Sequence, residues 1–362
     1  MIAALFAAAL AVSASCDLEH PSGHPGCTRA AVDALPMNRI QTVGTHNSYK
    51  MAIAPKEMAN IRRVNPKAAD SLDYSHIPLT DQLNGGARQL ELDFVYDPQG
   101  GRYLSPLGRK MAPDTTPYDL TPLARPGMKV MHVPDIDYRS VCPLLVDCLK
   151  EVHAWSKAHP DHMPILIIFN LKQDQLKVPG AVTLLPFDAV AMDALDSEIR
   201  SVFKDSELIT PDRVQGRHKT LAQAVHAGAW PRLRRARGKI MFALDEAPEV
   251  VALYRGDRRS LEGRVCFINT DETSPAAGYI TLNEPIELSS RIRKAVKSGL
   301  IVRTRADADT VEARTHDTKR RAAAFAAGAQ YVSTDYMQPD PRFGSYEVHL
   351  PGGGIARPDP VR

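Results

Sequence analysis

The sequence predicts an α/β fold consisting of a single irregular (β/α)8 barrel. Eight short apolar runs recur along the 362 residues, and helical patterns separate many of them. The runs are apolar on both faces, which is typical of parallel strands covered by helices. The composition, 44% hydrophobic and 24% charged, supplies one large core, although it also suits two smaller domains. An open doubly wound sheet is the alternative fold, but no GxGxxG motif follows a strand to support it.

The N-terminal stretch MIAALFAAALAVSASC has the length of the apolar region of a signal peptide, with small residues before a plausible cleavage point. We therefore expect residues 1–15 to be a signal peptide and residues 16–362 to form one domain with N- and C-terminal extensions. The stretch lacks basic residues at its start and is short for a membrane span. A disordered or core-packed N-terminus, or a lipoprotein acylated at Cys16, are the alternatives. A signal peptide predicts a secreted or periplasmic protein.

The five cysteines form two close pairs and one singleton. Such spacing is typical of an exported protein with two disulfides that close short loops. We expect the pairs Cys16–Cys27 and Cys142–Cys148. Cys266 lies inside the apolar run RVCFIN and is expected to be a buried free thiol. No Cys/His spacing indicates a zinc site.

The predicted strands carry three to five apolar residues each and end in polar or ionisable residues. In order they are RIQTVGTH (39–46), RQLELDFVYD (88–97), KVMHVPD (129–135), PILIIFNLK (164–172), KIMFALDE (239–246), RVCFINTD (264–271), LIVRTRAD (300–307) and QYVSTDY (330–336).

Three segments have the apolar spacing of three and four residues that is typical of helices, at 142–160, 187–204 and 307–330. Asp188 is a candidate N-cap for the second, and Gly328 suits the C′ position of the third. The connection from Pro98 to Met128 is rich in proline and reads as a loop, so the barrel should be irregular there.

The C-terminal ends of barrel strands form the active face of such folds. The polar residues at these ends therefore define the candidate site. They are His46 and Asn47, Glu91 and Asp93, His132 with Asp135 and Asp137, Asn170 and Lys172 with Asp174 beyond them, Asp245, Arg303 and Arg305, and Asp335 and Tyr336.

Glu91 and Asp93 are two residues apart on one strand, so their side chains should share a face. Like charges held so close favour a cation between them. Calcium accepts carboxylate and amide oxygens, so Asn47 and Asn170 would complete its shell with waters. Magnesium usually takes fewer protein ligands. The structural alternative is a salt-bridge cluster with Arg88 or Lys172.

Two histidines at neighbouring strand ends, His46 and His132, can supply one general acid and one electrophilic group. Packed or surface histidines are the alternative. Lys172, Arg303 and Arg305, with Tyr336, are the expected substrate-binding residues, because arginine matches phosphate oxygens in a bidentate way. Ion pairing of the arginines with Asp307, Asp309 or Asp335 is the alternative. Together the groups suit cleavage of a phosphate ester.

The net charge of +3 is too small to argue for nucleic acid as a partner. The basic stretch PRLRRARGK (231–239) could contact an anionic membrane surface transiently, although a solvated helix face is the simpler interpretation. We expect a monomer.

Several of these motifs resemble the calcium-dependent, phosphatidylinositol-specific phospholipase C family in its secreted bacterial branch. GTHNSY is similar to the family's first-strand motif, ELDFVYD to its Glu-x-Asp calcium pair, and MHVPDID to the segment with its second histidine. Residues 302–336 are similar to its last two strands and the helix between them. The likeness runs from about Cys16 to LPGGGIARPDP near the C-terminus.

The resemblance implies a phosphodiesterase barrel that holds Ca²⁺ through Asn47, Glu91 and Asp93. It implies that His46 stabilises pentavalent phosphorus and that His132 is the general acid. Glu91 would be the base by analogy. Attack by the inositol 2-hydroxyl would give diacylglycerol and a cyclic inositol phosphate, which can then be hydrolysed.

One departure concerns the fourth strand, where the family commonly has Glu and this chain has Asn170. A neutral ligand there leaves two formal charges in the shell, so calcium should bind more weakly. Two alternatives therefore stay open. One is a phosphodiesterase for soluble glycerophosphodiesters, and the other is a non-catalytic barrel that binds phosphoinositides or glycans.

Overall fold

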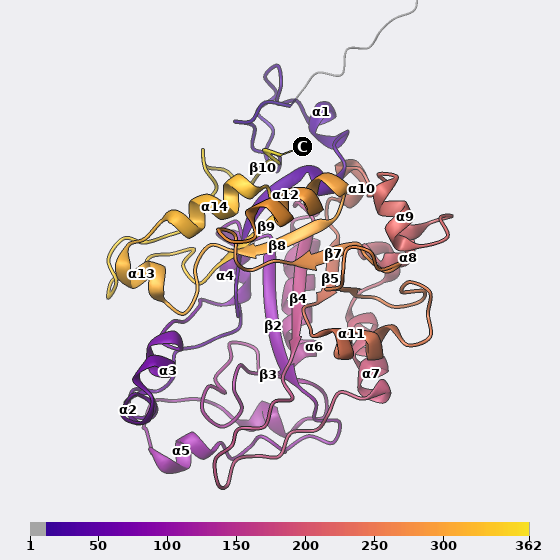
Figure 1. Ribbon diagram of the computed structural model, residues 1–362. Coiled ribbons are helices and arrows are strands. Elements are labelled where there is room, and N and C mark those ends of the chain that lie inside the picture. Colours follow the sequence, from indigo (N-terminus) through magenta and orange to yellow (C-terminus); the bar gives the residue numbers. More distant parts are fainter. Residues whose placement is uncertain (1–11, 362) are drawn as a thin grey trace, which may run out of the picture.

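The computed structural model describes residues 12–361, and a ring of parallel strands lies at its centre (Figure 1). In ring order the strands are β1 (Ile40–Thr45), β2 (Gln89–Val95), β4 (Ile165–Leu171), β5 (Ile240–Leu244), β6 (Phe267–Ile268), β7 (Tyr279–Thr281), β8 (Ile301–Arg305) and β9 (Tyr331–Thr334). Parallel ladders join β2, β4, β5 and β6, and also β7, β8, β9 and β1. The expected α/β class and irregular barrel agree with this arrangement.

Two looser seams join these ladders into one ring. At the first, the backbone N–H of Arg88 donates to the carbonyl of Val43 at 2.9 Å. A Cβ added to Gly44 would lie 2.2 Å from the carbonyl oxygen of Gln89, so only glycine permits β1 and β2 to approach this closely. At the second seam, Asn269 pairs with Tyr279 across β6 and β7.

The prediction that residues 129–135 form the third strand of the barrel is wrong. Its segment forms only β3 (Lys129–Val130), which pairs antiparallel with the C-terminal end of β2. The remaining place in the ring belongs to β7, a three-residue strand that we did not predict from the sequence. A second antiparallel strand, β10 (Ala356–Pro358), flanks β1.

Helices surround the strand ring in Figure 1. They are α1 (Arg29–Asp33), α2 (Pro55–Val64), α3 (Pro66–Ser71), α4 (Leu79–Asn84), α5 (Leu107–Met111), α6 (Leu145–Ala158), α7 (Ala189–Val202), α8 (Pro211–Gln215), α9 (Leu221–His226), α10 (Leu233–Ala236), α11 (Pro248–Arg255), α12 (Ser289–Ser298), α13 (Val311–Thr315) and α14 (Lys319–Ala327), with 3-10 turns at Met37–Arg39, Thr121–Ala124 and Asp205–Glu207.

The predicted helices at 142–160 and 187–204 are α6 and α7, and the side chain of Asp188 caps α7 by accepting from Ala191 N at 2.9 Å. The third predicted helix is divided into α13 and α14. His316 adopts a left-handed φ of 57° between them, and Gly328 ends α14 with a φ of 82°. The proline-rich connection contains only the short α5 and one 3-10 turn, as expected for an irregular barrel.

The alternation of β2 positions the candidate site. Leu90, Leu92 and Phe94 are fully buried in the main apolar core, where the ring of Phe94 contacts that of Phe169 at 5.3 Å between centroids. Glu91 and Asp93 lie between them in sequence and therefore point to the opposite face, into the ring.

Both predicted disulfides are present, Cys16–Cys27 and Cys142–Cys148, and Cys266 is a buried free thiol. Disulfides of this kind are typical of exported proteins. The predicted signal peptide falls mainly on residues 1–11, outside the described residues. Between residues 12 and 361, no helix has both the length and the apolar character needed to cross a bilayer.

Candidate active site

The carboxylates of Glu91 and Asp93 lie inside the ring and are each paired with a cation. Arg303 contacts Glu91 Oε2 through its NH2 group at 2.5 Å, and Lys172 Nζ lies 2.8 Å from Asp93 Oδ2. Lys172 also donates to Asn170 Oδ1 at 3.0 Å. Burial tends to lower the pKa of Lys172, but Asp93 raises it above its usual range, so the ammonium stays charged.

Asn47 lies between Tyr74 and Asp93. With its nitrogen turned toward Asp93, the amide donates to both carboxylate oxygens at 3.1 and 3.2 Å and accepts from the Tyr74 hydroxyl at 2.7 Å. A half-turn of this amide would exchange the two groups and place its oxygen beside the carboxylate. Asn47 has a φ of 46°, a left-handed conformation that asparagine tolerates better than most residues.

The residues fit a calcium ion, because the turned amide of Asn47 and the carboxylates of Glu91 and Asp93 would offer oxygen ligands from one cavity. Within residues 12–361, no three His, Cys, Asp or Glu side chains converge closely enough to hold a metal by themselves. A site here would therefore need the amide oxygen and waters. Any calcium would also have to compete with the ammonium of Lys172 for Asp93.

His46 follows β1 and is held on both sides of its ring. Its Nδ1 lies 2.8 Å from Asp335 Oδ1, and its Nε2 lies 3.9 Å from Glu91 Oε1. The ring stacks on Tyr74 with centroids 6.0 Å apart. Burial and the positive charge of Arg305 lower the pKa of His46 well below its usual value, so the imidazole is neutral at pH 7.

His132 forms a second histidine–aspartate pair, with Nδ1 2.8 Å from Asp137 Oδ2. Asp137 also lies 3.3 Å from Lys50 Nζ. Burial alone would raise the pKa of Asp137, but Lys50 and His132 lower it, so this carboxylate is charged and stabilises a protonated His132. The residue before His132, Met131, donates its backbone N–H to the carbonyl of Asp93 at 3.1 Å, which anchors the segment to β2.

A chain of contacts connects the two histidines. Lys50 Nζ lies 4.8 Å from the centroid of the Tyr74 ring, on which His46 stacks, and it also pairs with Asp137 beside His132. Lys50 and Tyr74 thus connect the two histidine–aspartate pairs.

Arg305 and Asp335 form the remaining buried pair, at 3.3 Å between NH2 and Oδ2. Asp307 Oδ1 accepts from Asp335 N at 2.8 Å. Burial raises the pKa of Asp335, and burial together with the charge of Asp335 raises the pKa of Asp307. One proton shared within this acidic pair would keep the two close carboxyl groups from repelling each other.

Two predicted site residues are engaged by other groups of the protein. Arg303 is 1% exposed, and its guanidinium contacts Glu91 and donates to Asn283, so its binding of a phosphate stays a prediction. Asn170 is the register partner of Asp93, but its oxygen is occupied by Lys172 and its nitrogen by the carbonyl of Asp245.

Tyr336 is 2% exposed, and substrate binding through it stays a prediction. Its ring packs against Tyr346 and Phe343 in a separate apolar cluster. Asp335 points into the ring, and the alternation of an extended chain turns the next residue outward.

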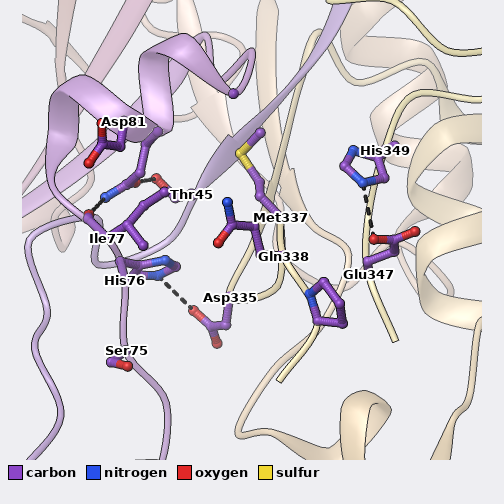
Figure 2. Close-up of a pocket in the computed structure, with 13 residues that line it drawn as sticks. Thr45, Ser75, His76, Ile77, Asp81, Asp335, Met337, Gln338, Glu347 and His349 are labelled. Atoms are coloured by element: carbon purple, nitrogen blue, oxygen red, sulfur yellow. Dashed lines mark hydrogen bonds and ion pairs between the residues drawn. The ribbon is translucent and has the colours of Figure 1, made fainter. Parts of the chain in front are cut away.

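Sequence reasoning missed Tyr74 and His76 because they lie on a loop without strand or helix periodicity. Nε2–H of His76 donates to the carbonyl of His46, 2.8 Å away, and Nε2 lies 3.9 Å from Asp335 Oδ1. A hollow of about 320 Å³ adjoins these residues, between α4 and the segment after β9 (Figure 2). Figure 2 shows His76 and Asp335 directed toward each other at its wall.

A parallel barrel whose rim carries two histidine–aspartate pairs around buried carboxylates defines a phosphodiesterase of the barrel class. The model of the family described as phosphoinositide phospholipase C, Ca²⁺-dependent, matches residues 35–360. The chain therefore belongs to that family, which confirms the resemblance found in its motifs. The comparison with curated proteins gives no match.

Two similar solved structures support the fold. A calcium-dependent phosphoinositol-specific phospholipase C from Pseudomonas sp., described as an apo form and myoinositol complex, is 18% identical, with a TM-score of 0.55 over 90% of this chain and 96% of that chain. A Ca²⁺-dependent phosphatidylinositol-specific phospholipase C from Streptomyces antibioticus is 17% identical, with a TM-score of 0.54 over 90% and 99%. At these identities the likeness shows the fold alone.

Proposed function

We propose that this protein is a calcium-dependent phosphodiesterase that cleaves phosphatidylinositol-type diesters to diacylglycerol and cyclic inositol phosphate. The observation that carries this proposal is the pair of histidine–aspartate contacts, His46–Asp335 and His132–Asp137. His46 lies 3.9 Å from Glu91, and the residue before His132 is hydrogen-bonded to Asp93. This arrangement supplies an acid, a hydrogen-bond donor and an acceptor around one phosphodiester.

In the first half-reaction, the inositol 2-hydroxyl attacks phosphorus and gives its proton to Glu91. Arg303 holds Oε2 of that carboxylate, which leaves Oε1 toward His46 as the acceptor. The bond from phosphorus to the glycerol oxygen breaks, and His132 protonates that oxygen. Asp137 supports this role because its negative charge stabilises the imidazolium.

His46 acts in its neutral form. A proton shared by Asp335 and Asp307 would let Asp335 donate to Nδ1 and keep the proton of His46 on Nε2. Nε2–H then donates to a phosphate oxygen as negative charge develops there. Calcium bound through Asn47, Glu91 and Asp93 would add positive charge at the same oxygens.

We also propose that residues 1–15 are removed on export, that residues 16–362 form the catalytic domain, and that the mature chain acts as a monomer with transient contact at a lipid surface. The two disulfides support export. Mass spectrometry of the exported chain and sedimentation of the purified protein would test these points.

The test of the function is ³¹P NMR of phosphatidylinositol in detergent micelles, with calcium or with a chelator. We expect the cyclic inositol phosphate signal to appear with calcium and to fall at least a hundredfold in His46→Ala and His132→Ala. His226→Ala, at an exposed helix end, is the matched control and should retain activity. Faster cleavage of glycerophosphoinositol would instead assign a soluble substrate, and tight binding without turnover would contradict an enzyme.

A further inference from the structure

A second hollow, of about 410 Å³, is lined by basic side chains and lies outside the candidate active site. We call it the basic hollow and define it by Arg213, Arg232, Arg234, Arg235 and Lys239. Leu208, Ile209 and Trp230 are buried and contribute its apolar wall. The exposed side chains of the four arginines surround this wall.

The positive charge of the basic hollow is not balanced by acidic partners. Within the part of the chain that the structure describes, none of the five basic side chains of the hollow forms an ion pair with an Asp or Glu carboxylate. Backbone carbonyls are the recorded partners of two of them, Ala34 O for Arg232 and Ser206 O for Lys239. Neighbouring Arg237, by contrast, pairs with Asp33 at 2.8 Å.

The surroundings of Lys239 show the effect of this crowding. Burial lowers the pKa of Lys239, and the positive charge of Arg213 lowers it further, which together outweigh the opposite effect of Glu207. A concave wall of low polarity with several like charges concentrates the field at its centre and attracts anions. The protein as a whole carries only +3, so a large part of its excess positive charge could act at this one place.

The basic hollow lies at the opposite end of the barrel from the candidate active site. Ile209 N donates to the carbonyl of Ile240, the first residue of β5, and Arg232 pairs with Pro36 before β1. The candidate site residues lie at the C-terminal ends of the strands instead. In Figure 1, α10 lies near α1 and α12 at the upper end of the molecule, whereas α5 and the proline-rich connection lie at the lower end.

We infer that the basic hollow is a binding site for a small oligophosphate, separate from the phosphodiester that the active site cleaves. Guanidinium groups contact phosphate oxygens through paired N–H donors, and four of them around one hollow suit several linked phosphates. A membrane surface fits less well, because docking through this end would turn the catalytic rim away from the lipid. Trp230 supports a preformed site, since its Nε1 donates to the carbonyl of Gly299 at 2.8 Å and fixes the wall.

The test is isothermal titration calorimetry of the full chain with inorganic tripolyphosphate at low and physiological salt. We expect binding by the wild type that weakens with salt, because salt screens charge–charge attraction. The double variant Arg234→Ala/Arg235→Ala should bind at least tenfold more weakly. The control Arg62→Ala/Arg63→Ala removes the same charge from two adjacent exposed arginines of α2 and should bind as the wild type does.

Three results would overturn the inference. The first is a wild type that does not bind tripolyphosphate. The second is a hollow variant that binds tripolyphosphate as tightly as the wild type. The third is a control variant that loses as much affinity as the hollow variant. Vesicles of phosphatidylglycerol and phosphatidylcholine form a further arm. Loss of vesicle binding in the hollow variant with intact tripolyphosphate binding would identify a membrane contact instead and overturn the oligophosphate site. Unchanged circular dichroism and phosphodiesterase activity would show that the hollow variant is folded.

Discussion

The ammonium of Lys172 lies 2.8 Å from Oδ2 of Asp93, one of the proposed calcium ligands. The amide oxygen of Asn170 is turned to the same ammonium, 3.0 Å away. The chain thus holds a positive charge of its own beside the proposed calcium ligands. Calcium must displace this ammonium or share Asp93 with it, and two cations that approach one carboxylate repel each other.

Replacing Lys172 by methionine should therefore tighten calcium binding. The side chain of Lys172 is 25% exposed, so solvent weakens the repulsion, and we expect about a tenfold lower Kd, or about 1.4 kcal/mol. Calorimetric titration of Lys172→Met and wild type with calcium alone measures this directly. Lys157→Met, at an exposed surface ion pair, is the control and should leave the Kd unchanged. Equal or weaker binding in a folded Lys172→Met variant would show that the ammonium does not compete.

Asp137→Asn should lower kcat about a hundredfold with little change in KM. The substitution removes the charge that stabilises a protonated His132, and a general acid typically contributes between a hundredfold and ten-thousandfold. Steady-state rates of cyclic phosphate release measure the effect. Asp114→Asn, at a half-buried position next to the first turn of α2, serves as the control. Wild-type kcat in Asp137→Asn would exclude this aspartate from the proposed acid catalysis.

The same aspartate should also contribute to stability in acid. Lys50 and His132 outweigh burial and lower the pKa of Asp137 below its reference value of 3.8. The folded state therefore releases this proton more readily than the unfolded state, so the stabilisation is present above pH 3.8 and is lost as pH falls through the folded value. Urea unfolding of the wild type should show this loss below about pH 4. Asp137→Asn should lack this contribution, so its free energy of unfolding should fall less at acid pH. An identical fall in both proteins would contradict the stabilising role of Asp137.

The strand-end residues show how far the sequence could predict this site. Alternation along one strand was sufficient to place Glu91 and Asp93 on one face, because that depends only on local geometry. The same rule, applied to Asp335, would have turned Tyr336 away from the cavity. Tyr74 and His76 could not be found in this way, since a loop without periodicity brings them to His46.

The barrel itself shows a similar limit. An apolar run predicts a strand but not its direction, so β3 was assigned to the ring although it runs antiparallel to β2. β7 has only three residues, Tyr279–Thr281, and a run that short does not stand out from a loop. Its parallel pairing with β8 is set by tertiary packing, which local patterns do not contain.

Glu246→Gln should stabilise the protein above neutral pH and not in acid. Burial raises the pKa of Glu246 to about 7 from a reference value of 4.5. The folded state therefore holds this proton between pH 4.5 and about 7 while the unfolded state has lost it, so the free energy of unfolding falls as pH rises through that window.

The glutamine variant carries no such proton and keeps an oxygen that can accept from Leu171 N. It should exceed the wild type in free energy of unfolding by on the order of 1–3 kcal/mol at pH 8, and match it at pH 4. Urea titrations at the two pH values measure the difference. Glu249→Gln, exposed in α11, is the control and should not change the difference between the two pH values. If Glu246→Gln has the same free energy of unfolding as the wild type at pH 8, ionisation of Glu246 does not destabilise the folded state.

Gly44→Ala should disrupt the seam between β1 and β2, because the backbone of Gln89 leaves no room for a Cβ at this position. The added methyl group would lie 2.2 Å from the carbonyl oxygen of Gln89 and 2.4 Å from its Cβ, and neither atom can move without shifting β2. Because β2 carries Glu91 and Asp93, the strain should reach the candidate site as well as the barrel. We expect a loss of about 3 kcal/mol or more in the free energy of unfolding, together with weaker calcium binding. Gly278→Ala, which would meet only side chains at 3.1 Å or more, is the matched control and should cost less. If Gly44→Ala unfolds at the same urea concentration as Gly278→Ala, the two strands are farther apart than the structure places them.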